Sequence, residues 1–576
     1  MRAVLAPMRA SCPRWTLAFV VLLAAPATGQ WRDARALGAG LAGLAQANAA
    51  RATLVTIATS PGGRAVQALR IGGGADVTTR PALLVVANAY GPHLVGSEIA
   101  LTTAQRLLQG YGRDSAITRL LNSTTIWFIP RLNPDAAEGM LGAVKWERVG
   151  NGTASDDDHD QLTDEDGPDD LDGNGLITSM RVADPNGEWV ADSLEPGLMR
   201  RADASKGEVG RFRLLGLEGK DDDGDGKYNE DAIGGTDINR NFAYNYLHHG
   251  TNAGAWSFAA TETRGFADFL IAHPEIAAVY VLGPQDNLMA PWTNRPSMGI
   301  ADPQGNRSPE GTSAGGQLNS ILRADEATFA DAARRFQKTT GLSKGPASAP
   351  LAGDVLSFLY YDFGRWAFGS RGWWVPEAPR DSAARGRPGT TGGNDPLSEE
   401  RNAFHWFRAN EPDALVPWHA VTLAGESRAV EAGGFAPGAM LNPPTGAQLD
   451  STLARQERFI VELAGMLPRV ALRDVKAEAL GDGVWRISAS VANEGVLPTA
   501  TALGARLRNP RGVRVDLDAK GGEILSGQKV QLLQPIPGGG RSTRLEWTLT
   551  GARGATVELR AGSPVTGTSL QTISLR

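Results

Sequence analysis

The chain has 576 residues, a formal net charge of −6 and 42% hydrophobic residues. Because a single hydrophobic core stops growing near ~250–300 residues, this length predicts two or more domains. Basic and aromatic residues do not cluster as nucleic-acid binding requires. Beyond the N-terminal segment no apolar run approaches the ~18 residues of a membrane span, so the sequence predicts neither a nucleic-acid partner nor a spanning helix.

Residues 1–27 are typical of a secretory signal peptide. Arg2, Arg9 and Arg14 precede an apolar run from about Thr16 to Ala25, which ends in the small residues Ala25–Ala27 and is too short for a spanning helix. The alternative is a buried N-terminal helix. Loss of the three arginines on cleavage would change the net charge from −6 to −9.

The single cysteine, Cys12, lies inside this segment, so the mature protein would contain no disulfide. Cys12 precedes the apolar run, whereas a lipidated cysteine would follow it. We therefore expect a soluble protein that is secreted or periplasmic.

Residues 28–467 alternate short apolar runs with helical patterns, which predicts an α/β domain with a mixed, mostly parallel sheet. One helix is expected over 97–109 with Ser97 as its N-cap. Further helices are expected over 261–274 and 445–468. The expected strands are 82–89, 124–130, 276–283 and 372–377.

Two segments depart from this rhythm. Residues 150–236 are acidic and glycine-rich and form an insertion in the α/β domain. Residues 468–576 contain short alternating strands with glycine turns, which predicts a separate C-terminal β-sandwich domain.

Five stretches, in order, resemble motifs of the carboxypeptidase A-type zinc carboxypeptidase family. They are "IPRLNPDAAEG" (129–139), "TDINRNFAYNY" (236–246), "SFAATETRGFADFL" (257–270), "GWWVPE" (372–377) and "VEAGGFAPGAMLNPP" (430–444). The resemblance covers about residues 35–467 and implies an α/β/α layered fold. It also implies zinc held by two histidines and a glutamate, a glutamate as general base, and an arginine and an asparagine that bind the substrate's terminal carboxylate.

The zinc-ligand positions of that family are changed in this sequence. In "NAYGPHLVGSE" (88–98), Tyr90 stands at the first histidine position and His93 at the glutamate position. Shifting the register to place His93 on the histidine position puts Gly96 at the glutamate position. The third position, after the strand at 276–283, is held by Gly283.

Other functional positions of the family are kept. Asn239 and Arg240 match the carboxylate-binding pair, Glu377 matches the catalytic glutamate, and Arg131 is a further cation that we expect in the cleft. The alternatives are a strand-end salt bridge for Arg240 and a structural carboxylate for Glu377. The tyrosine expected upstream of Glu377 is absent from "GPASAPLAGDVL" (345–356).

A different metal site is the other possibility at this place. His93, Glu98 and Asp286 lie near neighbouring strand ends, and a histidine with two carboxylates can ligate zinc, manganese or iron. A lone loop histidine is more often simply hydrogen-bonded.

The insertion places carboxylates at every second residue and follows them with glycine, a spacing that can wrap calcium. The alternative is a solvated acidic loop, but recurring like charges repel one another unless a cation neutralises them. The glutamate that ends an EF-hand loop is absent. The predicted structural calcium ligands form three sets: Asp156, Asp158 and Asp160; Asp170, Asp172 and Asn174; and Asp221, Asp223 and Asp225.

Two functions follow from these observations. The first is a pseudopeptidase that binds a peptide or a cell-wall peptide by its free C-terminus without hydrolysis. The second is an active metallocarboxypeptidase with a remodelled metal site. Loss of the ligand set favours the first, because binding needs only the retained cation whereas hydrolysis also needs a Lewis acid.

Overall fold

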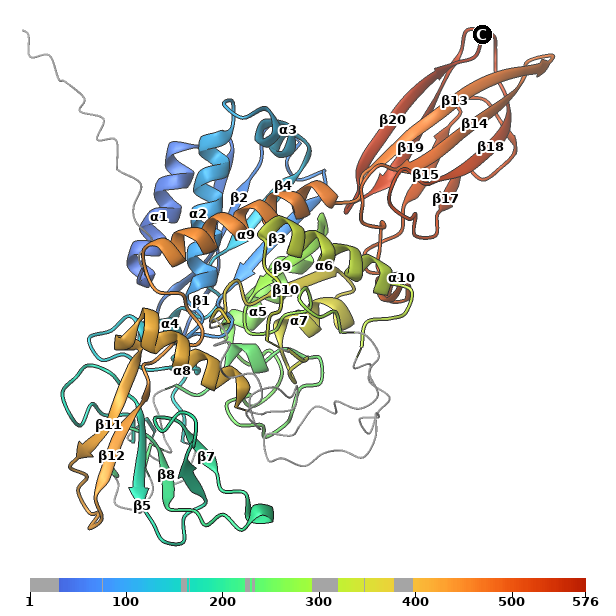
Figure 1. Ribbon diagram of the computed structural model, residues 1–576. Helices are drawn as coiled ribbons and strands as arrows, with labels where there is room; N and C mark the ends of the chain where they lie inside the picture. The colour runs from blue at the N-terminus through green and yellow to red at the C-terminus, as the bar shows by residue number, and fades with distance from the viewer. Residues whose placement is uncertain are drawn as a thin grey trace, which may run out of the picture.

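The computed structural model describes residues 31–74, 76–156, 163–164, 166–222, 228–229, 234–292, 320–346, 348–377 and 397–576. The signal-like segment 1–27 therefore lies outside the described residues. Figure 1 shows a helix-covered α/β domain, a smaller sheet at one end of it, and a C-terminal β domain at the other end.

A six-stranded sheet forms the centre of the α/β domain. Its strand order is β1 (Ala52–Thr59), β2 (Ala65–Ile71), β4 (Thr125–Ile129), β3 (Ala82–Ala87), β9 (Ile276–Leu282) and β10 (Trp366–Ser370). Strands β4, β3, β9 and β10 pair in parallel with their neighbours in this group. Strand β2 pairs antiparallel with both β1 and β4. Every residue of β3, β4, β9 and β10 is buried, which explains why these strands are continuous apolar runs. The predicted mixed, mostly parallel sheet is confirmed.

Helices cover this sheet. Helix α2 packs against β3 and β4 and, with α6, against α9, while α5 packs against β1. Gly96 allows α2 to pass close to the sheet, because a Cβ there would lie 2.9 Å from the Cβ atoms of Ala87 and Leu282. The helices of this domain are α1 (Ala34–Ala47), α2 (Val95–Gly110), α3 (Ser115–Ser123), α4 (Pro134–Ala137), α5 (Thr261–Ala272), α6 (Glu326–Thr340), α7 (Val355–Ser357), α8 (Ser398–Asn410) and α9 (Ala447–Met466).

Two local predictions are corrected here. Ser97 is not the N-cap of α2, since the helix begins at Val95 and Ser97 lies buried in its first turn. The strand predicted at 372–377 lies at Trp366–Ser370 instead. Trp373 and Val375 are buried in a separate apolar cluster with Trp406 and Phe407 of α8, so the pattern reflected burial rather than strand pairing.

The acidic insertion contributes to a second six-stranded sheet. Its order is β11 (Leu415–Val421), β12 (Val430–Phe435), β5 (Ser179–Ala183), β8 (Phe212–Leu217), β6 (Trp189–Ala191) and β7 (Met199–Arg201). All its strand pairs are antiparallel. Strands β11 and β12, which lie almost two hundred residues beyond β8 in the chain, thus complete this sheet.

Two four-stranded antiparallel sheets make up the C-terminal domain, consistent with the predicted β-sandwich. One contains β13 (Val470–Gly481), β14 (Val484–Asn493), β18 (Ser542–Thr550) and β16 (Ile524–Ser526); the other contains β17 (Val530–Leu532), β15 (Arg514–Asp518), β19 (Thr556–Ser563) and β20 (Gly567–Ser574). The connecting helix α10 (Ala502–Leu507) contacts the α/β domain, where the Asp325 carboxylate accepts a hydrogen bond from Ala502 N at 2.9 Å. Among the described residues no helix combines the length and apolar composition needed to cross a membrane.

Candidate functional site

The loop that follows β3 carries the first two candidate positions and is held rigidly. Asn88 adopts a φ of 58° and donates from Nδ2 to the carbonyl oxygens of Gly91 and His93 at 2.8 and 3.1 Å. From the other side, Asn442 donates to the Pro92 carbonyl at 2.9 Å and accepts from Val95 N at 3.0 Å. The loop is therefore fixed at both its turn and its entry into α2.

Tyr90 is half-buried in this loop and lies near charged side chains. Burial and the nearby carboxylates of Glu147 and Asp237 raise the pKa of the Tyr90 phenol well above its usual range, while Arg240 opposes the shift. The phenol is therefore neutral and able to donate a hydrogen bond. This electrostatic coupling links the loop after β3 to the segment that carries Asn239 and Arg240.

His93 is 1% exposed, and its Nε2 lies 2.8 Å from the carbonyl oxygen of Arg371. Since a carbonyl can only accept, Nε2 carries the hydrogen, and Nδ1 is a buried acceptor that meets no donor among the described residues. Burial lowers the pKa of the imidazole to about 4. His93 is therefore a neutral side chain that holds the turn after β10.

Gly283 follows β9, the neighbour of β3, so the carboxyl ends of these parallel strands bring it to the same edge of the sheet as Tyr90. A Cβ at Gly283 would meet no atom nearer than Val281 Cγ1, at 4.0 Å. There is room for a side chain here, but glycine supplies no donor atom.

Asn239 and Arg240 lie in the short 3-10 helix η3 (Ile238–Arg240), which Asp237 caps by accepting from Asn239 N at 2.8 Å. Asn239 is buried and committed to other partners: Nδ2 donates to Gln285 at 2.8 Å, and Oδ1 accepts from Val355 N at 3.3 Å. Arg240 is 28% exposed, and its Nε lies 3.6 Å from Asp237 Oδ2.

Asp237 itself is buried, and this burial raises the pKa of its carboxyl to about 7 despite the nearby guanidinium. Near neutral pH the Asp237 carboxyl is therefore partly protonated. It compensates the charge of Arg240 only in part.

Comparison with known proteins identifies the α/β domain. Residues 39–189 match the family model described as zinc carboxypeptidase. This part of the chain is metallocarboxypeptidase-like. Residues 469–574, most of the C-terminal domain, match a domain of unknown function.

Two curated relatives illustrate how local the sequence similarity is. Carboxypeptidase D of Drosophila melanogaster is 35% identical over 81 residues, 14% of this chain and 6% of the relative. Carboxypeptidase E of Caenorhabditis elegans is 36% identical over 76 residues, 13% of this chain and 16% of the relative. The chain thus matches only a small part of the length of either relative.

Solved structures include two similar carboxypeptidase-type chains. Thrombin activatable fibrinolysis inhibitor is 13% identical with a TM-score of 0.36 and covers 59% of this chain and 65% of its own. Carboxypeptidase A from Helicoverpa armigera is 13% identical with a TM-score of 0.35 and covers 59% of this chain and 63% of its own.

The residues predicted at the three zinc-ligand positions do not form a complete zinc-binding set. A zinc centre needs three side-chain donors, such as two histidines and a carboxylate, converging on one ion. Here Gly283 has no donor and the Tyr90 phenol keeps its proton, so of the three positions only His93 offers a free lone pair, on Nδ1.

The remodelled metal site is not assembled either. Glu98 is buried and accepts hydrogen bonds from the backbone and side chain of Arg32. Asp286 caps the following turn by accepting from Leu288 N and Met289 N at 2.8 and 2.7 Å. His93, Glu98 and Asp286 therefore do not converge, and the part of the chain that the structure describes holds one different group of potential ligands.

The contacts of Arg131 do not support the predicted place in the substrate cleft. Its guanidinium is 4% exposed, donates to Ser97 Oγ at 3.3 Å and to the Arg32 carbonyl at 2.8 Å, and lies 3.8 Å from Glu138. Glu98 stabilises its charge by Coulomb attraction. Arg131 thus joins α1, α2 and the segment after β4 in a buried charge network.

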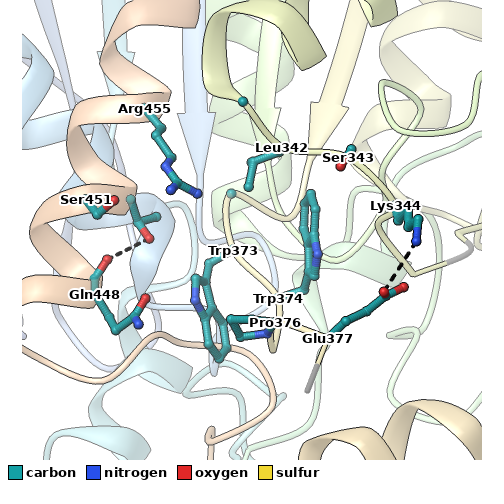
Figure 2. Close-up of a pocket in the computed structure, with 13 residues that line it drawn as sticks. Leu342, Ser343, Lys344, Trp373, Trp374, Pro376, Glu377, Gln448, Ser451 and Arg455 are labelled. Atoms are coloured by element: carbon teal, nitrogen blue, oxygen red, sulfur yellow. Dashed lines mark hydrogen bonds and ion pairs between the residues drawn. The ribbon is translucent and has the colours of Figure 1, made fainter. Parts of the chain in front are cut away.

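Glu377 lies seven residues beyond the end of β10 and is exposed. Its Oε2 is 3.5 Å from Lys344 Nζ, and both lie on the rim of a pocket of 330 Å³ beside α9 (Figure 2). Neither Tyr90 nor Arg240 lines this pocket. The proposed catalytic role of Glu377 is therefore not supported by proximity to the family's ligand positions.

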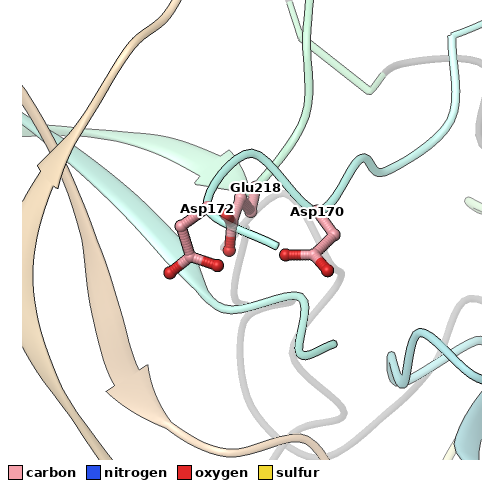
Figure 3. Close-up of side chains that lie close together, drawn as sticks. All are labelled: Asp170, Asp172 and Glu218. Atoms are coloured by element: carbon pink, nitrogen blue, oxygen red, sulfur yellow. The ribbon is translucent and has the colours of Figure 1, made fainter. Parts of the chain in front are cut away.

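In the insertion, the structure brings Asp170 and Asp172 together with Glu218, whose carboxylate oxygens approach within 4.8 Å of one another (Figure 3). Asn174 belongs to the same turn and donates to Asp172 Oδ2 at 2.7 Å. His419 of β11 lies 2.6 Å from the same oxygen. A hard cation is the ligand that such a set of oxygens could hold.

Glu218 was not identified from the sequence. It is buried at the end of β8 and accepts from Leu171 N at 2.9 Å and Thr178 N at 3.3 Å. Its only sequence signal is a carboxylate after an apolar-containing strand. Of the other predicted calcium ligands, Asp156 and Asp221 do not join this group, and Asp158, Asp160, Asp223 and Asp225 lie outside the described residues.

Proposed function

We propose that the carboxypeptidase-like domain binds peptides by their free C-terminal carboxylate without hydrolysing them. The observation that carries this proposal is the replacement of all three zinc-ligand positions, by Tyr90, His93 and Gly283, beside a retained Arg240. Amide hydrolysis in this family's chemistry needs a metal to polarise the carbonyl and activate water. Carboxylate binding needs only a suitably placed cation and hydrogen-bond donors.

Arg240 is the side chain that supports the binding role. Its guanidinium is partly exposed and lies at 3.6 Å from a single described ion-pair partner, Asp237. Because burial keeps Asp237 partly protonated near neutral pH, part of the Arg240 charge is left for a ligand. The neutral Tyr90 phenol, which is coupled to Arg240, would add a second donor toward the same carboxylate. Asn239 would act indirectly, by fixing Gln285.

The competing function is hydrolysis with a remodelled metal site. It requires His93, Glu98 and Asp286 to act as ligands. What weighs against it is that each of these side chains is buried and hydrogen-bonded to another part of the protein.

The binding proposal is tested by calorimetric titration with one peptide in free-acid and C-terminally amidated forms. We expect the free acid to bind at least about tenfold more tightly, since charge-assisted pairing is lost in the amide. Arg240→Gln is expected to remove that preference, and Arg264→Gln, which changes an exposed arginine of α5, is expected to keep it. Equal affinity for both peptides in the wild type would contradict the proposal.

We also propose that Asp170, Asp172, Asn174 and Glu218 hold a structural calcium ion. Three carboxylates converge from a tight turn and from the end of β8, and Asn174 lies in the same turn. Glu218 would take the place of the glutamate that ends an EF-hand loop, arriving from a distant strand rather than from the loop itself.

A further inference from the structure

A pocket of 330 Å³ lies between α9, the end of α6 and the segment after β10 (Figure 2). Its lining contains no residue of the predicted carboxylate-binding or zinc-ligand positions. The volume falls at the small end of ligand pockets and suits a single ring compound. Its walls are formed by Leu342, Lys344, Trp373, Trp374, Gln448 and Arg455, among others.

The floor of this pocket is fixed by buried hydrogen bonds. Gln456 of α9 donates to the Gly372 carbonyl at 2.9 Å and accepts from Tyr280 Oη at 2.6 Å. On the other side of the same turn, His93 holds the carbonyl of Arg371 at 2.8 Å. The two tryptophans that follow the turn are therefore presented by a backbone anchored to both α9 and the loop after β3.

Arg455 supplies the positive charge of the pocket. It is exposed on α9 and, within the part of the chain that the structure describes, makes no ion pair or hydrogen bond. In Figure 2 its guanidinium points from the helix toward the tryptophan side of the pocket. The other cation, Lys344, is already offset by Glu377 at 3.5 Å. The pocket therefore favours a ligand with one negative charge.

The two indoles supply flat apolar surface. Trp374 is half-buried and stands across the pocket from Arg455 (Figure 2). Trp373 is 6% exposed, and its Nε1–H meets no acceptor among the described residues.

We propose that this pocket binds a small organic acid in which a carboxylate group is attached to a ring. The carboxylate pairs with Arg455, and the ring stacks on Trp374. The ring belongs either to an acidic sugar or to an aromatic acid, since both offer a face that packs on an indole. This site is separate from the peptide site proposed around Arg240.

Isothermal titration calorimetry with four probes tests the proposal. Glucuronate and benzoate carry both a ring and a carboxylate, glucose lacks the charge, and acetate lacks the ring. We expect at least one of the ring carboxylates to bind at least fivefold more tightly than glucose and acetate. Preference for glucuronate would identify an acidic sugar, and preference for benzoate an aromatic acid.

Variants separate this site from the rest of the protein. Arg455→Gln and Trp374→Ala are each expected to weaken the ring carboxylate at least fivefold. Arg458→Gln, on the same helix but outside the pocket, and Arg240→Gln are expected to leave it unchanged. The proposal is overturned if neither ring carboxylate binds better than glucose and acetate, or if Arg455→Gln leaves the affinity unchanged. Because Arg240→Gln tests only the peptide site, failure of one proposal does not imply failure of the other.

Discussion

The Nε2 atom of His93 lies 2.8 Å from the carbonyl oxygen of Arg371 and joins the loop after β3 to the turn after β10. The same residue stands at a zinc-ligand position of the metallocarboxypeptidase family. A side chain at a position used for metal binding thus holds two strand ends together through a neutral hydrogen bond.

Replacement of His93 is expected to cost stability. In His93→Ala the buried Arg371 carbonyl loses its donor and a cavity remains, so the free energy of unfolding should fall by about 2–4 kcal/mol. Chemical denaturation measures this change. His405→Ala, which alters an exposed histidine of α8, is the matched control and should stay within about 0.5 kcal/mol of the wild type. A His93→Ala protein as stable as the control would show that the hydrogen bond is unimportant.

Asp237 is expected to make stability depend on pH. Burial raises the pKa of its carboxyl to about 7 in the folded protein, from 3.8 when exposed. Between these values the folded state binds the extra proton, so the free energy of unfolding falls as pH rises from about 4 to about 7. Asp237→Asn should reduce this loss by up to about 4 kcal/mol. Denaturation at several pH values measures it, and identical slopes for both proteins would refute this assignment.

Arg131 is expected to matter for folding and not for ligands. Its buried guanidinium donates to Ser97 and to the Arg32 carbonyl and lies 3.8 Å from Glu138, so Arg131→Gln should lower the free energy of unfolding by about 2–4 kcal/mol. Affinity for a free C-terminal peptide should not change. Paired denaturation and titration check both statements. If Arg131→Gln weakened peptide binding but left the free energy of unfolding unchanged, Arg131 would belong to the binding site.

Calcium is expected to stabilise the insertion. An ion that binds only the folded state at a concentration 100 times its Kd adds about 2.7 kcal/mol, so removal by a chelator should lower Tm by several degrees. The double variant Asp172→Asn, Glu218→Gln should have a Tm that no longer depends on calcium. Asp413→Asn, an exposed carboxylate elsewhere, should respond as the wild type does. A wild-type Tm that is the same with and without calcium would rule out the site.

The central strands could be predicted from the sequence because strands buried on both faces are apolar throughout, as β3, β4 and β9 are. The segment 372–377 was misassigned because Trp373 and Val375 are equally apolar but bury against α8. The local apolar pattern of a sequence indicates that a segment is buried, but it does not indicate which element the segment packs against.

From the sequence, the candidate site could be predicted only for residues that lie within a single motif. The positions of Tyr90, His93 and Gly283 follow from single motifs. The hydrogen bonds from Arg131 to Ser97 and Arg32, the approach of Glu218 to Asp170, and the pairing of β11 and β12 with the insertion depend on contacts between distant segments. Such contacts leave no periodic signal in the sequence.

The central claim is that this carboxypeptidase-like domain binds peptide C-termini without cleaving them. The most direct test is to incubate the purified protein with zinc and a free-acid peptide that it binds, and to follow the peptide by mass spectrometry. The account predicts that the peptide remains intact at any zinc concentration that leaves the protein folded. Zinc-dependent release of the C-terminal residue, abolished by His93→Ala, would contradict it and would establish a metal site built around His93.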